Sequence, residues 1–161
     1  MPKTLMCDPK LLEKDLSGRT YIVTGANSGA GFATAEQLAK QGAQVIGACR
    51  RVDAGKAAFA DLDARGSVEI MELNLASLAS VRTFAEAFKA KYDRLDGLIN
   101  NAGVMAVPEG KTVDGFETQF GINHLGHFLL AELLLDTLKA SAPARIVNVS
   151  SAAHAGMMGA T

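Results

Sequence analysis

The segment from Thr24 to Gly31 holds the residues whose types and spacing most clearly suggest chemistry, in the pattern TGxxxGxG. It follows a short apolar run and precedes an amphipathic stretch, so it is expected to turn the chain from a strand into a helix. Glycines let a phosphate approach the backbone, and free N–H groups at a helix start bind anions. The pattern therefore predicts a dinucleotide pyrophosphate site, rather than an ordinary strand–helix turn, formed by Gly25, Asn27, Ser28, Gly29, Ala30 and Gly31.

Two arginines, Arg50 and Arg51, follow the apolar run 44–49. Sites that prefer NAD place an acidic residue near the end of the second strand, where it binds the ribose 2′-OH. Here the acidic residue is missing, and a guanidinium suits a 2′-phosphate through charge-assisted, bidentate bonds. We therefore predict that Arg50 contacts the cofactor and that NADP(H) is preferred over NAD(H). The alternative is that both arginines merely lie on a solvated loop.

Three more polar motifs follow in the sequence. They are Asn100-Asn101-Ala102-Gly103 after an apolar run, Asn123 at the start of NHLGHF, and the pair Ser150-Ser151 after another apolar run. Each motif alone has an ordinary explanation, which is an Asn-Gly turn, a polar residue on a helix, or serines in a turn. Together with the glycine-rich segment, in this order, they predict one shared site.

The hydrophobic periodicity predicts the elements that would position these motifs. Short apolar runs predict strands, and stretches with apolar residues on one face predict helices. The expected strands are 21–23, 44–49, 68–73, 95–99 and 145–149, and the expected helices are 31–41, 53–64, 77–92 and 116–140. This alternation is typical of parallel βαβ units with right-handed crossovers. We predict an α/β fold, a doubly wound parallel sheet of the Rossmann type with the strand order 3-2-1-4-5.

The length of 161 residues suits one domain and leaves no room for a separate substrate domain. Residues 1–17 are polar and are expected to form a loosely held arm, with 18–161 as the dinucleotide-binding domain. The net charge of -1, with both signs interspersed, favours neither nucleic acid nor an anionic membrane as a partner. No signal peptide and no membrane-spanning apolar run is visible, so we expect a cytoplasmic protein.

The cysteines and histidines give no metal-site pattern. Cys7 and Cys49 form neither a CxxC nor a zinc-like motif, and both thiols are expected to be free in a reducing compartment. His124 and His127 are three residues apart but have no third ligand motif beside them. Packing on the helix is therefore favoured over metal binding for these two histidines.

In their order, TGxxxGxG, NNAG, the central Asn and the serine pair resemble the short-chain dehydrogenase/reductase family over roughly residues 18–156. The segments DLSGRTYIVTGANSG, NNAGVM, NHLGHFLL and RIVNVSS look most like the retinol dehydrogenase and WW-domain oxidoreductase branch. NHLGHFLL also resembles light-dependent protochlorophyllide reductase, which ranks second. The resemblance implies an NADP(H)-dependent oxidoreductase acting on a carbonyl or alcohol, retinoid-like or otherwise apolar. A non-catalytic nucleotide-binding or interaction protein is the alternative.

The resemblance also implies roles for individual residues. Asn101, Ala102 and Gly103 match the motif that leaves room for the nicotinamide ribose. Asn74 and Leu75 follow the third strand, where the family usually has an Asp that touches the adenine amino group. Asn74 keeps a carbonyl acceptor, so adenine binding is expected to be weakened and not lost.

Two catalytic residues are implied in the same way. Asn123 matches the Asn whose backbone carbonyl holds a water that relays protons towards the active-site Lys, and Ser151 matches the Ser that hydrogen-bonds the substrate oxygen. The general acid, the Tyr of YxxxK, has no match, since the tyrosines are Tyr21 and Tyr92. These 161 residues alone are expected to be catalytically silent, either as part of a longer oxidoreductase or as a non-catalytic protein.

The sequence departs from the family pattern at Ala30, where a bulky apolar residue usually stands between the last two glycines. This change is expected to loosen the packing beneath the cofactor without abolishing the turn. The run 145–149 is expected to form an exposed sheet edge, and the helix 116–140 is apolar on more than one face. We therefore expect a homo-oligomer or an aggregation-prone chain.

Overall fold

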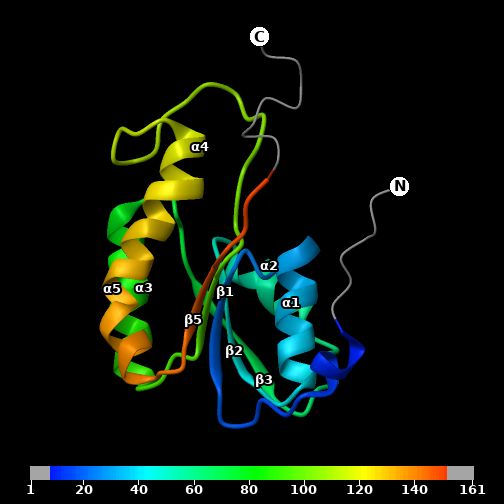
Figure 1. The fold of residues 1–161 in the computed structure, drawn as a ribbon. Coiled ribbons are helices and arrows are strands. Elements are labelled where there is room, and N and C mark those ends of the chain that lie inside the picture. Colours follow the sequence, from blue (N-terminus) through cyan, green and yellow to red (C-terminus); the bar gives the residue numbers. More distant parts are fainter. Residues whose placement is uncertain (1–7, 152–161) are drawn as a thin grey trace.

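The computed structural model describes residues 8–151, which form a five-stranded parallel sheet covered by helices on both faces (Figure 1). The strand order β3-β2-β1-β4-β5 confirms the predicted doubly wound fold. Each pair of neighbouring strands in this sheet is parallel. The strands are β1 (Thr20–Thr24), β2 (Gln44–Cys49), β3 (Ser67–Glu72), β4 (Gly97–Asn100) and β5 (Arg145–Asn148).

The helices divide between the two faces of the sheet. Figure 1 shows α3 and α5 on one side and α1 and α2 on the other. The strand order reverses between β1 and β4, so a crevice opens there at the carboxyl ends of the strands. The helical elements are η1 (Pro9–Glu13), α1 (Gly29–Lys40), α2 (Val52–Ala58), α3 (Leu78–Lys91), α4 (Thr118–Phe120), η2 (Gly121–Leu125) and α5 (Gly126–Ala140).

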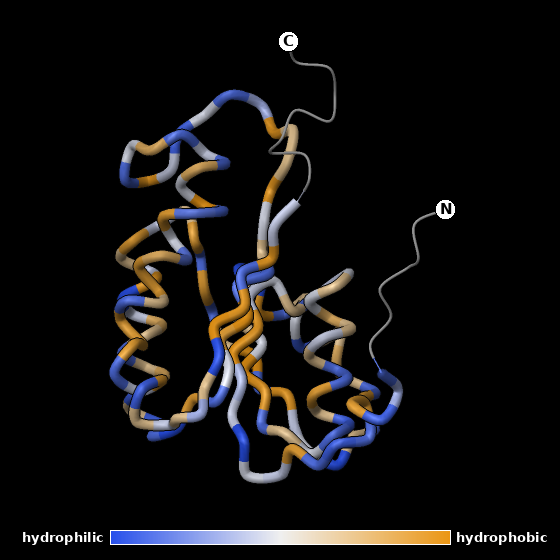
Figure 2. Tube along the Cα trace, in the orientation of Figure 1, coloured by the Kyte–Doolittle hydropathy of each residue, from blue (hydrophilic) through white to orange (hydrophobic). Residues whose placement is uncertain are grey.

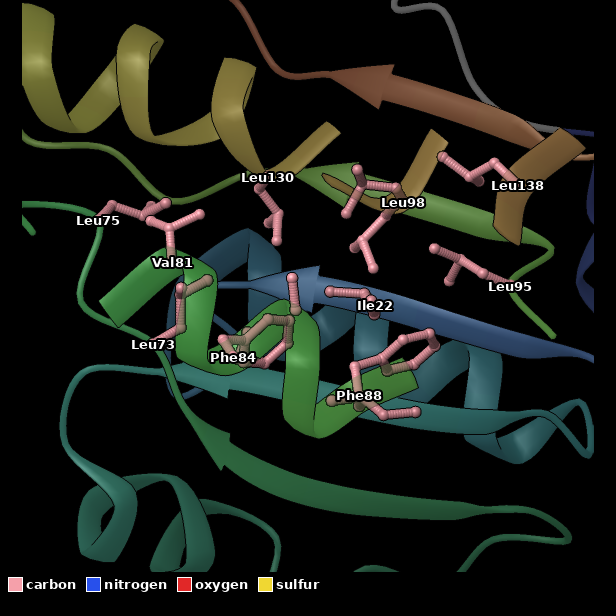
Figure 3. Packing of buried hydrophobic residues seen from close by; sticks show 14 residues of the cluster. Ile22, Leu73, Leu75, Val81, Phe84, Phe88, Leu95, Leu98, Leu130 and Leu138 are labelled. Atoms are coloured by element: carbon pink, nitrogen blue, oxygen red, sulfur yellow. The ribbon is translucent and has the colours of Figure 1, made fainter. Parts of the chain in front are cut away.

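The hydrophobic core lies on both faces of the sheet, because the central strands are apolar on both sides. Figure 2 shows hydrophobic residues, coloured orange, along the central strands. On the face of α3 and α5, Phe84 and Phe88 belong to the same buried cluster as Ile22 and Leu98 (Figure 3). These four side chains are at most 2% exposed, and burying each stabilises the fold by about 1.5–3 kcal/mol. This packing holds α3 and α5 against one face of the sheet.

The helix predicted over 53–64 is shorter than expected, because α2 ends at Ala58. The chain continues in tight turns in which Leu62 N–H donates to Phe59 O. The ring of Phe59 stacks on Phe32 of α1, with ring centres 4.8 Å apart. Packing of Phe59 against the neighbouring helix therefore overrides the helical preference of this Ala-rich segment.

The helix predicted over 116–140 begins two residues later and is not a uniform α-helix. Glu117 caps it, since its carboxylate accepts hydrogen bonds from the N–H groups of Gln119 and Phe120. Residues 121–125 form a π-helical turn in which Gly126 N–H donates to Gly121 O. Such turns are frequent at functional sites.

The strand predicted over 95–99 begins at Gly97. Asp96 stands before it, with its carboxylate bound to the Arg94 guanidinium at 2.6 Å and 2.7 Å and to Thr20 N–H at 2.9 Å. Burial raises the pKa of Asp96, but these bonds outweigh it and hold the pKa below its ordinary value. This carboxylate joins the starts of β1 and β4 at the end of the sheet away from the glycine-rich turn.

Residues 8–17, predicted as part of a loosely held arm, contact α1. Gln41 Nε2 donates to the carbonyl oxygens of Leu11 and Lys14, and Leu16 is 8% exposed in the core. These contacts correct the expectation of a loose arm for residues 8–17, while the proposed domain boundary at residue 18 stays a prediction. Cys49 is buried with a free thiol, and Cys7 lies outside the described residues.

Candidate cofactor and active site

The glycine-rich turn joins β1 to α1 at the centre of the sheet. Gly25 and Gly29 have φ angles of +67° and +56°, which favour glycine. At Gly31 the need is for space, because a Cβ there would lie 2.4 Å from Gly25 O and 2.5 Å from Asn101 Nδ2. Gly31 therefore lets α1 pack directly against the ends of β1 and β4.

The start of α1 is suited to an anion. Ser28 is the N-cap residue, and its hydroxyl makes no capping hydrogen bond. The first turn contains no acidic side chain. A Cβ on Gly29 would meet no atom within 4 Å, so the backbone there faces open space. The unpaired N–H groups of the first helical turn can therefore receive a phosphate.

Many of the predicted cofactor residues line one cavity of about 190 Å³. It extends from the glycine-rich turn to the ends of β2 and β3 and to the NNAG motif. Its predicted members are Gly25, Asn27, Arg50, Asn74, Leu75, Ala102 and Gly103, and Arg51 also lines it. Ser28, Gly29, Ala30 and Gly31 do not line this cavity and lie instead at the start of α1.

Arg50 and Arg51 are exposed beside this cavity. Within residues 8–151 neither guanidinium forms an ion pair, although five ion pairs are formed elsewhere in that range. The two positive charges are therefore available to an anionic ligand.

Asn74 is fixed by its own turn. Its Oδ1 accepts a hydrogen bond from Ala76 N–H at 3.1 Å, and its N–H donates to Ser80 Oγ at 3.0 Å. An amide oxygen has two lone pairs, so one remains for a ligand.

The NNAG motif is attached to the end of β1. Asn101 Nδ2 donates to Thr24 O at 2.9 Å, and the N–H groups of Asn101 and Ala102 both donate to Thr24 Oγ1 at 2.9 Å. The resemblance gave Thr24 no separate role, although this threonine begins the motif. Thr24 therefore joins the glycine-rich turn to the NNAG motif through both its buried hydroxyl and its backbone carbonyl.

Asn123 and Ser151 line a second cavity of about 780 Å³. Asn101, Ala102 and Gly103 line it as well, and the last two border both cavities. The two cavities therefore adjoin at the NNAG motif and run along the carboxyl ends of the strands. The described residues lining the second cavity include Val104, Met105 and Val149, and none of them is a tyrosine or a lysine.

The Asn123 side chain holds the loop that follows the NNAG motif. Its Oδ1 accepts from Val104 N–H and its Nδ2 donates to Val104 O, both at 2.8 Å. The backbone carbonyl of Asn123 accepts from His127 Nδ1 at 3.0 Å, a contact that the sequence reasoning missed. The sequence does contain a signal for this contact, because a histidine stands four residues after Asn123 in a largely apolar helix.

The two histidines have separate partners. His124 stacks on Phe120 with ring centres 5.2 Å apart, whereas His127 bonds Thr24 and Asn123. Within residues 8–151 there is no cluster of three His, Cys, Asp or Glu side chains suited to a metal ion. In the same range no helix combines the length and apolar character needed to cross a bilayer.

Comparison with known proteins identifies the family. The model of the family described as short chain dehydrogenase matches residues 19–160, and the chain belongs to this family of oxidoreductases. Retinol dehydrogenase 12 of Homo sapiens is 54% identical over 142 residues, which cover 86% of this chain and 45% of the relative. Retinol dehydrogenase 14 of Mus musculus is 50% identical over 157 residues, covering 89% of this chain and 46% of the relative. The chain spans about half the length of these relatives.

Solved structures support the same fold. The RhlG/NADP active-site complex of Pseudomonas aeruginosa has a TM-score of 0.78 and 34% identity, covering 90% of this chain and 59% of that chain. A metagenomic short-chain oxidoreductase in complex with NADP has a TM-score of 0.73 and 31% identity, covering 84% and 63%. These similarities confirm the predicted family and its likeness to retinol dehydrogenases.

Proposed function

We propose that the chain is the cofactor-binding part of an NADP(H)-dependent short-chain oxidoreductase that acts on an apolar carbonyl or alcohol. The unpaired Arg50 beside the cavity at the end of β2 is the observation that carries the cofactor assignment. The names of the retinol dehydrogenase relatives support an apolar, retinoid-like substrate. When bound, the nicotinamide ring would donate or accept the hydride.

The residues present fit a dinucleotide. The first turn of α1 would hold the pyrophosphate, because its N–H groups are free and Gly29 leaves the space above them open. Asn74 Oδ1 would accept from the adenine amino group with its second lone pair. Ala102 and Gly103 would lie beside the nicotinamide ribose, where both cavities meet.

Arg50 would bind the 2′-phosphate that distinguishes NADP(H) from NAD(H). A guanidinium with no carboxylate partner gives up no ion pair when it binds a phosphate. A site that prefers NAD(H) would instead need an acceptor for the 2′-OH at the end of β2, and the residue after Cys49 is the cation Arg50. Arg51 lines the same cavity and adds positive charge without being required for the assignment.

In the second cavity, Ser151 would donate a hydrogen bond to the substrate oxygen. Asn123 would hold a water through its backbone carbonyl, as part of a proton relay. Because the described lining of this cavity includes no tyrosine and no lysine, the proton donor would come from outside residues 8–151. The apolar residues Val104, Met105 and Val149 would contact an apolar substrate.

Isothermal titration calorimetry of the chain with NADPH and NADH tests the cofactor assignment. NADPH is expected to bind more tightly than NADH. Arg50→Ala should weaken NADPH binding by about 1–3 kcal/mol and leave NADH binding almost unchanged, since a charged hydrogen bond contributes about this much. The exposed Arg82 on α3 provides a matched control, and Arg82→Ala should change neither affinity. Equal losses for both cofactors in Arg50→Ala would rule out the 2′-phosphate contact.

A further inference from the structure

Thr24 and His127 form a buried contact between the glycine-rich turn and the helix that carries Asn123. Thr24 is fully buried and His127 is 5% exposed. Thr24 Oγ1 lies 2.9 Å from His127 Nε2, and on the other side of the same ring Nδ1 lies 3.0 Å from Asn123 O. One imidazole therefore connects the end of β1 with a backbone carbonyl in the π-helical turn.

The hydrogen bonds assign the tautomer of His127. A threonine hydroxyl has two acceptor lone pairs and one proton. The N–H groups of Asn101 and Ala102 both donate to Thr24 Oγ1, and Asn101 N–H is shared with Ile99 O at 3.0 Å. The Thr24 hydroxyl proton can go to His127 Nε2 at 2.9 Å or to Ile99 O at 3.4 Å, and the shorter contact is the better hydrogen bond. Nε2 is then an acceptor, so Nδ1 carries the ring proton and donates to Asn123 O.

The surroundings favour this neutral form of the ring. Among the described residues that line the cavity beside His127, the other titratable side chain is His124, and none is an aspartate, glutamate, lysine or arginine. Burial lowers the pKa of His127, and the neighbouring His124 lowers it further, against the opposite effect of the Asn123 carbonyl. A second ring proton on Nε2 would face a hydroxyl oxygen that already accepts hydrogen bonds from two backbone N–H groups.

Asn123, whose backbone carbonyl accepts the hydrogen bond from His127 Nδ1–H, is held from two sides. Asn123 is fixed through its side chain by the two bonds to Val104, and through its backbone oxygen by His127. The π-helical turn around it depends on two glycines: a Cβ would lie 2.4 Å from Thr112 Cγ2 at Gly121, and 2.7 Å from Leu75 O at Gly126. The direction of the Asn123 carbonyl is therefore set by long-range contacts as well as by the helix.

We propose that His127, as the neutral Nδ1–H tautomer, is a positioning residue that couples the glycine-rich turn and the NNAG motif to the Asn123 carbonyl. The coupling deepens the proposed function and rests on it, because the Asn123 carbonyl matters as part of that site. Cofactor contacts at the NNAG motif would reach the Asn123 backbone carbonyl through Thr24 and His127, beside the direct bonds between the Asn123 side chain and Val104. His127 itself would touch neither the cofactor nor the substrate.

Nuclear magnetic resonance of the isotope-labelled, unmodified chain tests the tautomer without any substitution. The expected spectrum shows a proton on Nδ1 of His127 and an unprotonated Nε2 at neutral pH. A proton on Nε2 instead, or on both nitrogens, would overturn the proposal. This measurement requires neither a cofactor nor catalytic activity.

Two variants separate the two ends of the contact. In His127→Asn the side-chain amide can occupy the Nδ1 position and bond the Asn123 carbonyl, but it does not reach Thr24. In His127→Gln the amide can reach Thr24, but it leaves the Asn123 carbonyl without its donor. The Asn123 carbonyl ¹³C resonance should therefore stay in place in the first variant and shift in the second, with the amide signals of Asn101 and Ala102 doing the reverse. Identical changes in both variants would contradict the proposal.

Adding NADPH tests the coupling itself. In the unmodified chain saturating NADPH should shift the Asn123 carbonyl resonance, and both His127 variants should still bind NADPH but lose most of that shift. A full shift in either variant, or none in the unmodified chain with NADPH bound, would overturn the coupling. Failure of the unmodified chain to bind NADPH would instead refute the proposed function, while the tautomer measurement would still decide whether His127 has the assigned role.

Discussion

Gly31 of α1 lies so close to Asn101 of the NNAG motif that a β-carbon on Gly31 would stand 2.5 Å from Asn101 Nδ2. Two motifs separated by seventy residues in the chain are therefore in direct contact, and the contact requires the absence of one side chain. The same β-carbon would stand 2.4 Å from Gly25 O, a backbone atom that cannot move away cheaply.

Gly31→Ala is expected to destabilise the fold by about 1–3 kcal/mol, the usual cost of an overpacked core. Alanine has a higher helix propensity than glycine and would by itself stabilise α1. A loss of stability would therefore come from packing, and a gain would come from propensity. Urea unfolding followed by circular dichroism measures the change. Ala33→Gly, at an exposed position of the same helix, is the control and should cost about 0.5–1 kcal/mol through propensity alone. An increase in stability for Gly31→Ala would show that a β-carbon fits beside Asn101 and would contradict the close contact.

Thr24→Val keeps the shape of the side chain and removes the hydroxyl. The N–H groups of Asn101 and Ala102 and the His127 ring then lose their shared partner. Unfolding in urea should show a loss of about 1–3 kcal/mol, the cost of leaving a buried polar group without a partner. Thr24→Ser retains the hydroxyl and should recover most of this loss, whereas equal losses in the two variants would assign the effect to packing.

Stability should fall as the pH drops below the ordinary pKa of histidine, about 6.5. Burial lowers the pKa of His127 in the folded chain, so the unfolded chain binds a proton first. The contribution of His127 is therefore complete above pH 6.5 and is lost as the pH falls towards the lowered value, with a slope of at most about 1.4 kcal/mol per pH unit.

The contribution of His127 can be separated from that of the carboxylates. Glu69 and Asp96 also have lowered pKa values, but their contributions are lost at lower pH, below their ordinary values of 4.5 and 3.8. Denaturant midpoints measured from pH 5 to pH 8 should therefore fall less steeply with acid in His127→Gln. The same slope in both proteins would exclude His127 as the source.

The sheet and the cofactor turn could be predicted from the sequence because their signals are local. Apolar runs such as 44–49 mark strands buried on both faces, and the Gly25 to Gly31 spacing marks a turn with room for a phosphate. The end of α2 could not be predicted, because it depends on Phe59 stacking on Phe32. For the same reason the π-helical turn was missed, since Gly121 and Gly126 meet Thr112 and Leu75 only in the folded chain.

The motifs of the candidate site could be predicted from the sequence, but the hydrogen bonds that connect them could not. The family pattern led to Asn101 and Asn123, but it gave no reason to join them through Thr24 and His127. That connection needs the distances between β1, β4 and the helical segment that carries both Asn123 and His127. The expectation of a loose arm over residues 8–17 was wrong for a similar reason. Polar residues surround Leu16 in the sequence, and only the folded chain shows that its side chain is buried in the core.

Self-association of the 161-residue chain remains a prediction of the exposed apolar surface. In the described sheet β5 pairs only with β4, and Ile146 and Val147 on β5 are 41% and 48% exposed. Phe128 on α5 is 59% exposed. Light scattering over a concentration series should show species larger than the 16.8 kDa monomer. Val147→Lys should reduce association by placing a charge on the edge strand, and a monomer at all concentrations would contradict the prediction.

The carboxyl ends of β1, β2 and β4 are proposed to form an NADP(H) site, and amide chemical-shift mapping of the labelled chain with NADPH is the decisive experiment. We expect the largest shifts at residues 25–31, at Arg50 and at residues 101–103, with NADH leaving the Arg50 amide nearly unchanged. No saturable shifts with NADPH, or shifts confined to the exposed side of α5 and β5, would contradict it.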